Sequence, residues 1–442
     1  MVYRPPLLLK PIAYPFDIKS DCLDANNIKP GQQASCIIVH NTQQLQNHAG
    51  VGQGSTTPID IILNNGIYPA DDLTPPLAAF PNQKFLKFSA AHRLWARTPG
   101  EAIIHFGIDT GSPSNEARYT GPEFHGLVID ILDPQHAVLN FNSPTAPTIA
   151  FSMWGAAKNA LIEDLFIIVN KQVNQGIQAV QGDAADGLKI RRTVVNGFDK
   201  YGIITQYCRK NSIDNFQCND QRPEVSMVLE DLVVTDIGGN FDPSNLAESE
   251  NVAITMGAPG RLSRVRVRDV TRVGIGTQGT MTDGILEDLD VDRIGLGQKF
   301  EYGKALYIEN TTRNTEFTRF CVGPTVEIGL ISEWNHCNAF SNSIALNSDC
   351  FWRGLDNTVR DAVISANFIG INFDQGTVRS RIENVTFRNA SKTGIVIFNN
   401  IDNVQLNNHF DLPPGVCPVS YKHWNANTPC TMITSPDDFI NP

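Results

Sequence analysis

Apolar and polar residues alternate in short runs along most of the chain, and the same pair of runs returns repeatedly. Within residues 381–398, Ile382, Val385 and Phe387 form a first run, and Gly394-Ile395-Val396-Ile397 forms a second after a polar turn. Each run is too short for an amphipathic helix and has the period of two that is typical of a strand. One such unit cannot bury its apolar side alone, so the recurrence predicts a solenoid.

A four-residue signature marks these units: an apolar residue, an acidic residue, Asp or Asn, and a second apolar residue. It occurs as Ile162-Glu163-Asp164-Leu165, Leu229-Glu230-Asp231-Leu232, Leu286-Glu287-Asp288-Leu289, Ile382-Glu383-Asn384-Val385 and Ile401-Asp402-Asn403-Val404, with looser copies at Ile190-Arg191-Arg192-Thr193 and Val359-Arg360-Asp361-Ala362. The closest copies are about 20 to 25 residues apart, and no amphipathic helix accompanies them, which favours a parallel β-helix over a leucine-rich repeat. We expect the Asp or Asn of the signature to occupy one turn position in coil after coil.

With these repeats the chain resembles the right-handed parallel β-helix superfamily, which includes pectate lyases, polygalacturonases, alginate-processing enzymes and phage tailspikes. The resemblance covers residues 58–410 and implies an all-β, right-handed parallel β-helix solenoid. It implies no single activity, because that superfamily hosts several chemistries and also proteins without catalysis. The polygalacturonase motifs are absent, and Asp133-Pro134-Gln135-His136 departs by one inserted residue from the Asp-Pro-His of alginate epimerases. No catalytic role is therefore carried over.

The repeat region is expected to be one domain between two caps. Residues 1–57 are predicted to form an N-terminal cap, residues 58–410 the β-helix domain, and the Pro-rich residues 411–442 a C-terminal cap. A solenoid needs capped ends and can grow as one long domain.

The charge balance limits the partners. Charged residues make up 18% of the chain and the net charge is −11, which argues against nucleic acid. A polyanionic glycan is disfavoured unless cations or a local basic patch intervene. No run of 18 apolar residues is present, so the sequence predicts no membrane span. It does not indicate an oligomeric state.

The cysteines favour an extracellular protein, although the N-terminus lacks the apolar region of a signal peptide. Eight of the nine cysteines fall into close pairs that predict local disulfides, with Cys321 left over: Cys22/Cys36, Cys208/Cys218, Cys337/Cys350 and Cys417/Cys430. Buried free thiols in a cytosolic protein remain the alternative. Without a CxxC pair, a thiolate metal site is not expected.

The second run of each unit carries the predicted functional site. When the runs are aligned on their Gly-Ile start, strand alternation turns the third and fifth residues of each run outward. The column of fifth residues comprises Val180, Gln206, Thr255, Gln278, Glu309, Asn347, Asp374 and Phe398. Glu309 and Asp374 are then two coils apart with Asn347 between them, or about 9–10 Å at a strand spacing of about 4.8 Å. That separation is near the upper end of the range for two carboxylates that invert a glycosidic bond.

We therefore predict an extracellular enzyme that hydrolyses a polysaccharide, with Glu309 and Asp374 as general acid and base. The predicted substrate-binding residues are Gln206, Gln278, Tyr307, Asn347, Trp352, Arg353 and Asn372. The alternative is that each of these is an ordinary solvated residue on a polar face. No cofactor is required by this chemistry; the loop carboxylates Asp183, Asp186, Asp242, Glu248 and Glu250 leave calcium as an option, without EF-hand spacing.

Two other function classes stay open. A lyase or uronan C5-epimerase would abstract the proton beside a carboxylate, with Tyr307, His125 or an arginine as candidates. A non-catalytic solenoid, like a tailspike or an adhesin, would bind glycan without cleaving it. On another strand, Arg264, Arg266 and Arg268 face Asp288, Asp290 and Asp292 of the next coil, which predicts surface charge pairs or, as the alternative, a basic docking site.

Overall fold

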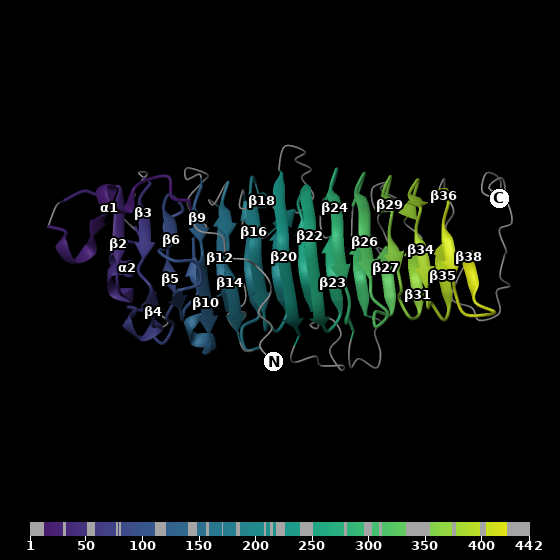
Figure 1. Cartoon of the computed structure of the whole chain (residues 1–442), viewed down its shortest axis with the longest axis horizontal. Coiled ribbons are helices and arrows are strands. Elements are labelled where there is room, and N and C mark those ends of the chain that lie inside the picture. The colour runs from purple at the N-terminus through teal and green to yellow at the C-terminus, as the bar shows by residue number, and fades with distance from the viewer. Residues whose placement is uncertain are drawn as a thin grey trace. The chain divides into compact units, whose positions relative to one another are not determined.

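A computed structural model of the chain describes residues 13–29, 32–50, 58–76, 78, 81–110, 121–139, 148–155, 159–169, 171–182, 186–206, 209–212, 215–217, 226–238, 251–277, 281–295, 303–308, 312–332, 354–373, 377–397 and 404–421. The chain divides into two compact units. Unit 1 comprises residues 1–217 and 226–233, and unit 2 comprises residues 218–225 and 234–442. Within each unit the strands lie side by side in chain order (Figure 1).

Unit 1 consists of parallel strands arranged in three ladders, in which each strand pairs with the equivalent strand of the neighbouring coil. The first ladder contains β1 (Leu23–Asp24), β2 (Cys36–Val39), β3 (Asp60–Leu63), β6 (Arg93–Ala96), β9 (Glu123–His125), β13 (Leu161–Glu163) and β16 (Lys189–Asn196). The second contains β4 (Gly66–Tyr68), β7 (Ala102–Ile104), β10 (Leu127–Ile131), β14 (Phe166–Val169) and the end of β16. The third contains β5 (Leu86–Lys87), β8 (Ile108–Asp109), β12 (Thr148–Gly155), β15 (Gln175–Gly182) and β17 (Tyr201–Gln206).

Unit 2 repeats this arrangement. Its first and second ladders share the long strands β22 (Gly260–Val270), β24 (Ile285–Val291) and β26 (Glu316–Val322). The first ladder continues with β29 (Thr358–Arg360), β33 (Arg381–Glu383) and β36 (Val404–Leu406), and the second with β30 (Val363–Ile364), β34 (Thr386–Arg388) and β37 (His409–Asp411). The third contains β21 (Val252–Gly257), β23 (Val273–Thr277), β25 (Lys304–Ile308), β27 (Ile328–Ser332), β31 (Ile369–Phe373), β35 (Thr393–Ile397) and β38 (Cys417–Tyr421).

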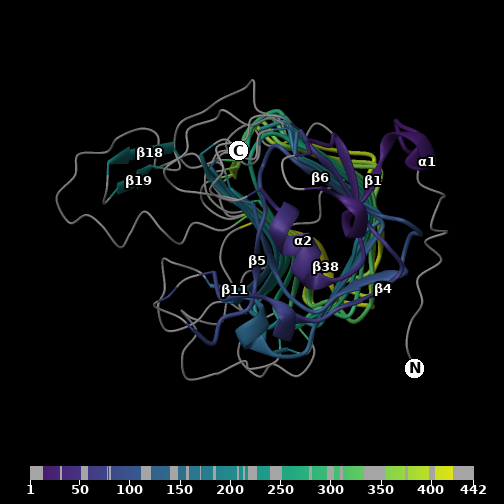
Figure 2. The ribbon, with the colours of Figure 1, turned by 90° about the vertical axis from the view of Figure 1, so that its left-hand side faces the viewer.

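The remaining elements are short. β11 (Val138–Leu139) pairs with β12 and β18 (Arg209–Ser212) pairs with β19 (Asn215–Gln217), both antiparallel, while β28 (Gly354–Leu355) pairs with β32 (Thr377–Val378) in parallel. β20 (Met227–Ile237) runs through the boundary between the units. The helices are α1 (Ile18–Asp21), α2 (Thr42–His48) and the 3-10 turns η1 (Ala25–Asn27), η2 (Ala70–Asp72) and η3 (Pro134–His136). Viewed along the stack, α2 lies across the end of the coil in unit 1 (Figure 2), with Leu45 fully buried.

Apolar columns fill the interior of each unit, because strand alternation turns every second residue inward and the parallel register stacks equivalent residues. One column of unit 1 consists of Ile61, Leu94, Phe124, Ile162 and Ile190, all fully buried. Each such side chain contributes roughly 1.5–3 kcal/mol of hydrophobic stabilisation. The chain is a parallel β-helix, as the repeats predicted.

A corner with positive φ joins the first ladder to the second in most coils. The corner residues are Asp164, Arg192 and Asp231 in unit 1 and Arg264, Asp288, Arg319, Asp361, Asn384 and Asn407 in unit 2, with φ between 48° and 56°. Asp and Asn tolerate this left-handed conformation better than other non-glycine residues, which explains their place in the repeat signature. The predicted single turn position is therefore confirmed.

Neighbouring corners are joined by their side chains. Arg192 donates to both carboxylate oxygens of Asp164, at 2.8 and 3.0 Å. Arg319 binds Asp288 in the same way, at 2.8 and 3.1 Å, and Asn384 donates to Asp361 at 3.2 Å. The bidentate pairs fix the distance between successive coils as well as neutralising charge.

Several sequence-based boundaries need correction or extension. The last signature copy was placed at residues 401–404, but β36 pairs Arg381 with Val404, so the corner equivalent to Asn384 is Asn407. Asn403 lies outside the described residues. The ladders also reach into both predicted caps, since β2 pairs with β3 and β38 pairs with β35.

The predicted Cys22–Cys36 disulfide is confirmed, Cys417 is also disulfide-bonded, and Cys321 is free and exposed.

The corner conformation predicts an order of stability among Asp288 variants. Asp288→Ala is expected to lower the free energy of unfolding by about 1–3 kcal/mol, because it removes the bidentate partner of Arg319 and puts a β-carbon without a polar group at φ 54°. Asp288→Gly loses the same partner but tolerates the φ angle, so it is expected to lose clearly less. Urea unfolding measures both.

Asp411→Ala serves as the control, because Asp411 is exposed and lies in the same unit outside the corners. Equal losses for Asp288→Ala and Asp288→Gly would contradict the role of the positive φ angle.

Candidate functional site

The outer face of the third ladder in unit 2 holds the two predicted site residues whose side chains the structure describes. Tyr307 on β25 pairs with Ile331 on β27, and Ile331 pairs with Asn372 on β31. The flanking residues Leu306 and Ile371 are buried inside, so the predicted alternation of inward and outward residues is confirmed here. Tyr307 and Asn372 therefore lie in one outward column, two strands apart.

The strand between them differs from the expected one. The alignment used Ser343–Asn347, but the register gives Ile328–Ser332, with Ser332 between Ile308 and Phe373. Gly329 is the sequence feature that identifies this strand. A β-carbon there would meet the carbonyl of Gly370 and the side chain of Ile364, so this position needs glycine, as do the other Gly-Ile starts.

The structure describes no side chain for the two predicted catalytic residues or for most of the predicted substrate contacts. Glu309, Asp374, Gln278, Asn347, Trp352 and Arg353 lie outside the described residues, and Gln206 is described only by the backbone of β17. Their proposed roles stay predictions.

The described outward positions on this ladder are largely buried, and they are the third residues of the runs rather than the fifth residues that form the predicted polar column. Ile331 is 3% exposed, Asn372 6% and Val396 8%. Ile328, Ile331, Ile369 and Val396 form an apolar cluster, against which Tyr307 and Phe368 pack.

Tyr307 remains partly exposed at the edge of this cluster. The ammonium group of Lys304 lies 4.8 Å from the centroid of its ring, which is a cation–π distance. The described third-ladder strands of unit 2 contain no Asp, Glu or His. This face thus offers a partly exposed aromatic ring beside the buried Lys304, while any carboxylate or imidazole must come from outside these strands.

A second cluster surrounds His125 on the first ladder of unit 1. The His125 ring stacks on Trp95, with centroids 3.8 Å apart and an interplanar angle of 4°. Its Nε2 lies 3.0 Å from Glu123 Oε2, and its Nδ1 lies 3.9 Å from Glu163 Oε1. Trp95 in turn donates from Nε1 to Asp60 at 2.8 Å. His125 is almost fully buried between these partners, which favours a structural role over the proton transfer considered from the sequence.

The Glu123 carboxylate beside His125 is held ionised. The hydrogen bond from His125 lowers the pKa of Glu123, and its charge and that of Arg93 act in the same direction against the effect of burial. A general acid needs a raised pKa, so Glu123 does not supply one. Glu163 is bound by Arg191 at 3.0 Å and by Arg192 at 2.7 Å.

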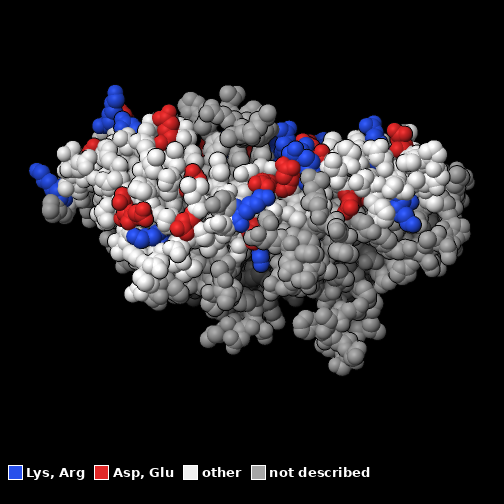
Figure 3. Space-filling view, turned by 90° about the horizontal axis from the view of Figure 1, so that it is seen from below, with Lys and Arg blue, Asp and Glu red and all other residues white. Residues whose placement is uncertain are grey.

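Charge pairs also cover the first two ladders of unit 2. Arg266 and Arg268 contact Asp290 at 3.2 and 2.6 Å, which confirms the predicted pairing between coils. In Figure 3 basic and acidic side chains lie next to one another on the face shown. Burial raises the pKa of Glu287, but hydrogen bonds from Arg319 and Arg261 outweigh it, so the net pKa is lowered. The arrangement favours structural pairing over a basic docking site.

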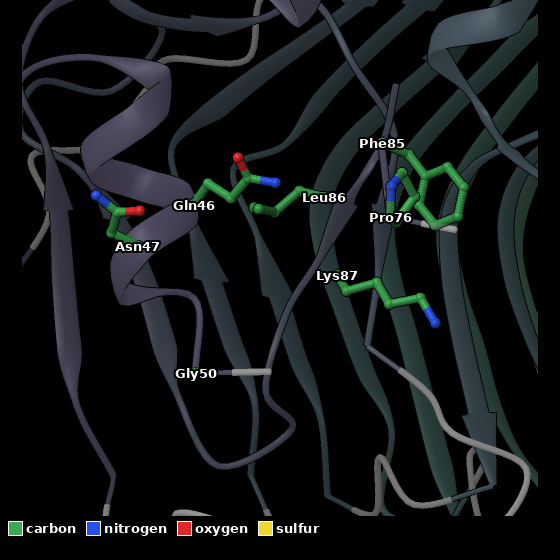
Figure 4. Close-up of a pocket in the computed structure, with 7 residues that line it drawn as sticks. All are labelled: Gln46, Asn47, Gly50, Pro76, Phe85, Leu86 and Lys87. Carbon is green, nitrogen blue, oxygen red and sulfur yellow. The ribbon is translucent and has the colours of Figure 1, made fainter. Parts of the chain in front are cut away.

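A small cavity of about 230 Å³ lies in unit 1 between α2 and β5. It is lined by Gln46, Asn47, Gly50, Pro76, Phe85, Leu86 and Lys87 (Figure 4). Gln46 uses both ends of its amide on the backbone of Thr74, at 3.0 and 3.1 Å. None of the lining residues is an acid, a histidine or a nucleophile. The cavity therefore carries no catalytic set.

Metal and membrane signals are equally limited. Within the described ranges, no group of three or more His, Cys, Asp and Glu residues could hold a metal ion. No helix in the described part of the chain is long and apolar enough to span a membrane. The calcium option raised from the sequence concerns mostly residues outside these ranges.

No protein-family model matches the chain, and no curated protein matches it in sequence. Solved structures with the parallel β-helix fold do match. The surface adhesin PfbA of Streptococcus pneumoniae is 14% identical over 88% of this chain and 90% of its own, with a TM-score of 0.46. The catalytic unit of a GH87 alpha-1,3-glucanase from Streptomyces thermodiastaticus is 11% identical over 93% of this chain and 70% of its own, with a TM-score of 0.43.

A third similar structure is the A-module of the mannuronan C-5 epimerase AlgE4 from Azotobacter vinelandii. It is 12% identical over 87% of this chain and 100% of its own, with a TM-score of 0.37. This chain shares the parallel β-helix with these proteins. At such identities the likeness concerns the fold alone.

The His125 cluster predicts a pH-dependent stability difference. Glu123 has a lowered pKa in the folded state, so it stabilises the fold above its ordinary pKa of about 4.5, and this contribution is lost as the pH falls through the folded value. His125→Phe keeps a ring against Trp95 but removes the hydrogen bond to Glu123. We expect it to lower the free energy of unfolding by about 1–2 kcal/mol at pH 6 and by less at pH 3.

Chemical unfolding followed by tryptophan fluorescence at both pH values measures this difference. His409→Phe is the control, because His409 is exposed on β37 in the other unit. A deficit of the same size at pH 3 and pH 6 would show that the loss comes from packing alone.

Proposed function

We propose that this protein acts on a polysaccharide along the outer face of the third ladder of unit 2, where it hydrolyses glycosidic bonds with Glu309 and Asp374 as general acid and base. The supporting observation is the register of β25, β27 and β31. Ile308 and Phe373, the residues directly before Glu309 and Asp374, both align with Ser332 and are thus two strands apart. The carboxylates therefore follow strand ends separated by about 9–10 Å.

That separation of the strand ends is near the upper end of the carboxylate spacing in inverting enzymes. Inverting glycosidases hold two carboxyl groups roughly 6.5–9.5 Å apart, so that a water molecule fits beside the sugar. One carboxyl group protonates the leaving oxygen while the other activates the water. Because the described third-ladder strands of unit 2 carry no Asp, Glu or His, the acid and base must come from residues beyond the ends of these strands, and the proposal takes Glu309 and Asp374.

Tyr307 is proposed as the platform for a sugar ring. It is the partly exposed aromatic residue of the outward column, and Lys304 and the apolar cluster hold its ring in place. An aromatic face packs against the apolar face of a sugar, which is the contact proposed for Tyr307. Gln206, Gln278, Asn347, Trp352 and Arg353 remain proposed contacts on the same substrate, while the burial of Asn372 gives it a smaller part.

The proposed location is extracellular. A disulfide joins Cys22 to Cys36, and Cys417 is also disulfide-bonded. Disulfides persist in oxidising compartments, where polysaccharide substrates are also found. The proposal requires no cofactor.

The first experiment is a screen of purified protein against neutral and uronic-acid glycans, with reducing ends and near-ultraviolet absorbance measured together. The hydrolase proposal expects new reducing ends without absorbance. Glu309→Gln and Asp374→Asn should each lose at least about 100-fold in activity, since a positioned acid or base contributes roughly 10²–10⁴-fold. Asp411→Asn, an isosteric change at an exposed carboxylate of the same unit, should keep full activity.

Two other outcomes separate the remaining function classes. Absorbance that survives in Glu309→Gln and Asp374→Asn would overturn the hydrolase and assign a lyase with its base elsewhere. Binding without any product would indicate a glycan-binding solenoid. The solved structures of this fold are described as enzymes in some cases and as an adhesin in another, so the fold does not separate these classes.

The platform makes its own prediction on whichever glycan is bound. Tyr307→Ala is expected to weaken binding about 3- to 10-fold, because a ring contact is worth roughly 0.5–1.5 kcal/mol. Tyr307→Phe keeps the ring and should stay within about twofold of the wild type. Isothermal titration calorimetry on the Glu309→Gln background measures the affinity without turnover. A loss in Tyr307→Phe equal to that in Tyr307→Ala would place the interaction in the hydroxyl group instead.

A further inference from the structure

The outer face of the second ladder in unit 1 carries an apolar stripe. The register aligns Ile67 with Ile103, Ile103 with Val128, Val128 with Phe166 and Phe166 with Val194. Strand alternation turns all five outward, because their neighbours Tyr68, Ile104, Ile129, Ile167 and Val195 are buried inside. Five successive strands thus present an apolar side chain at the same position (β4, β10 and β14 follow one another along unit 1 in Figure 1).

The stripe is open to solvent at its first strand, half-buried at Ile103, Val128 and Phe166, and closed at Val194, which is 6% exposed. Ile67 is 58% exposed, and next to the stripe on the same face Leu132 is 64% and Ile168 41% exposed. These are the three large apolar side chains that are exposed in the described part of unit 1, and they gather on one face. The equivalent outward column of unit 2 is polar at its start, with Arg266, Asp290 and Cys321. Large exposed apolar patches on soluble proteins mark interaction sites.

We propose that this face binds the same face of a second copy of the chain, related by a two-fold axis that lies parallel to the strands between β7 and β10. Such an axis reverses the order of the strands while keeping each position along them. Ile103 then faces Val128 of the second copy, and Ile67 faces Phe166. Equal strand spacing on both sides lets the side chains of the two columns interdigitate.

A polar pair supports the same axis. Asp130 lies two residues after Val128 and is the one carboxylate among the described outward positions of this ladder, where no Lys or Arg occurs. His105 lies two residues after Ile103, so it takes the neighbouring place on the adjacent coil. The proposed axis brings Asp130 of each copy opposite His105 of the other. An imidazole can donate a hydrogen bond to a carboxylate, so the face carries a polar pair that is complementary to itself.

The footprint predicts a weak dimer. Four opposed strands at about 4.8 Å span roughly 19 Å, and five positions along each strand span roughly 16 Å, so the contact covers roughly 300 Å², well below the roughly 800 Å² per partner of a standard interface. We expect a dissociation constant of roughly 10–500 µM, in keeping with a small, transient interface. This inference concerns unit 1 and does not depend on the proposed polysaccharide chemistry of unit 2.

Sedimentation velocity of the full chain from roughly 5 to 500 µM tests the proposal. The weight-average mass of the wild type should rise with concentration toward that of a dimer. Ile67→Glu combined with Ile168→Glu should stay monomeric, since both side chains are exposed and the change leaves the core intact. Ile285→Glu is the matched control: Ile285 is 40% exposed in unit 2, and its variant should associate like the wild type.

A charge exchange tests the axis itself. His105→Asp sets two carboxylates against each other and should weaken association at least about threefold. Adding Asp130→Lys to that variant restores an opposite pair across the axis and should restore association. Circular dichroism confirms that each variant is folded.

Three results would overturn the proposal. They are a wild type that is monomeric at every concentration, association that survives in the Ile67→Glu and Ile168→Glu variant, and a double charge exchange that restores nothing. A monomeric wild type that binds phosphatidylcholine vesicles through Ile67 and Ile168 would assign the face to a lipid surface instead.

Discussion

The bidentate ion pair between corner residues of successive coils is the interaction on which the regular part of this fold depends. A single left-handed residue turns each strand out of the first ladder into the second, and an arginine in that conformation is unfavourable by roughly 1–2 kcal/mol. The pairs of Arg192 with Asp164 and of Arg319 with Asp288 offset that cost and, being bidentate, also fix where one corner lies over the next. Because a slip of one residue would turn every apolar side chain outward, fixing the corner fixes the columns as well.

The columns decide which chemistry each face can offer. On the first ladder, Glu163 and Glu287 face outward and are bound by arginines of neighbouring coils. The net pKa of Glu287 is lowered, so it stays ionised and serves poorly as a general acid. On the third ladder, the described strands of unit 2 lack Asp and Glu. Glycine near the start of these strands lets that ladder pack closely against side chains of the second ladder. The stabilising charges and the proposed substrate face thus lie on different sides of the coil.

Much of the fold could be predicted from the sequence, and the errors have physical causes. The signature located the corners at Asp164, Asp231, Asp288, Asp361 and Asn384 because Asp and Asn suit positive φ. It did not identify Arg264 and Arg319 as corners, since arginine has no such preference and is placed there by its neighbours' charge. β27 was missed because Ser343–Asn347 was taken as the strand between β25 and β31, and the outward Ile331 of β27 is buried in an apolar cluster. The alternating pattern gives the direction in which a side chain points. Its burial depends on the segments that pack over it, and a local sequence pattern contains no information about those segments.

The candidate site shows the same limit more sharply. The sequence placed two strands two coils apart: the strand of Tyr307, which precedes Glu309, and the strand that precedes Asp374. The register of β25 and β31 agrees with this, but the strand between them was wrongly assigned. The separation survived that error because it depends only on the number of coils, and two strand steps are the same whichever segment fills the middle. A property set by counting coils is thus more secure than one set by the identity of a neighbour. For this reason the distance between the two strand ends carries the functional argument, and Asn347 carries none of it.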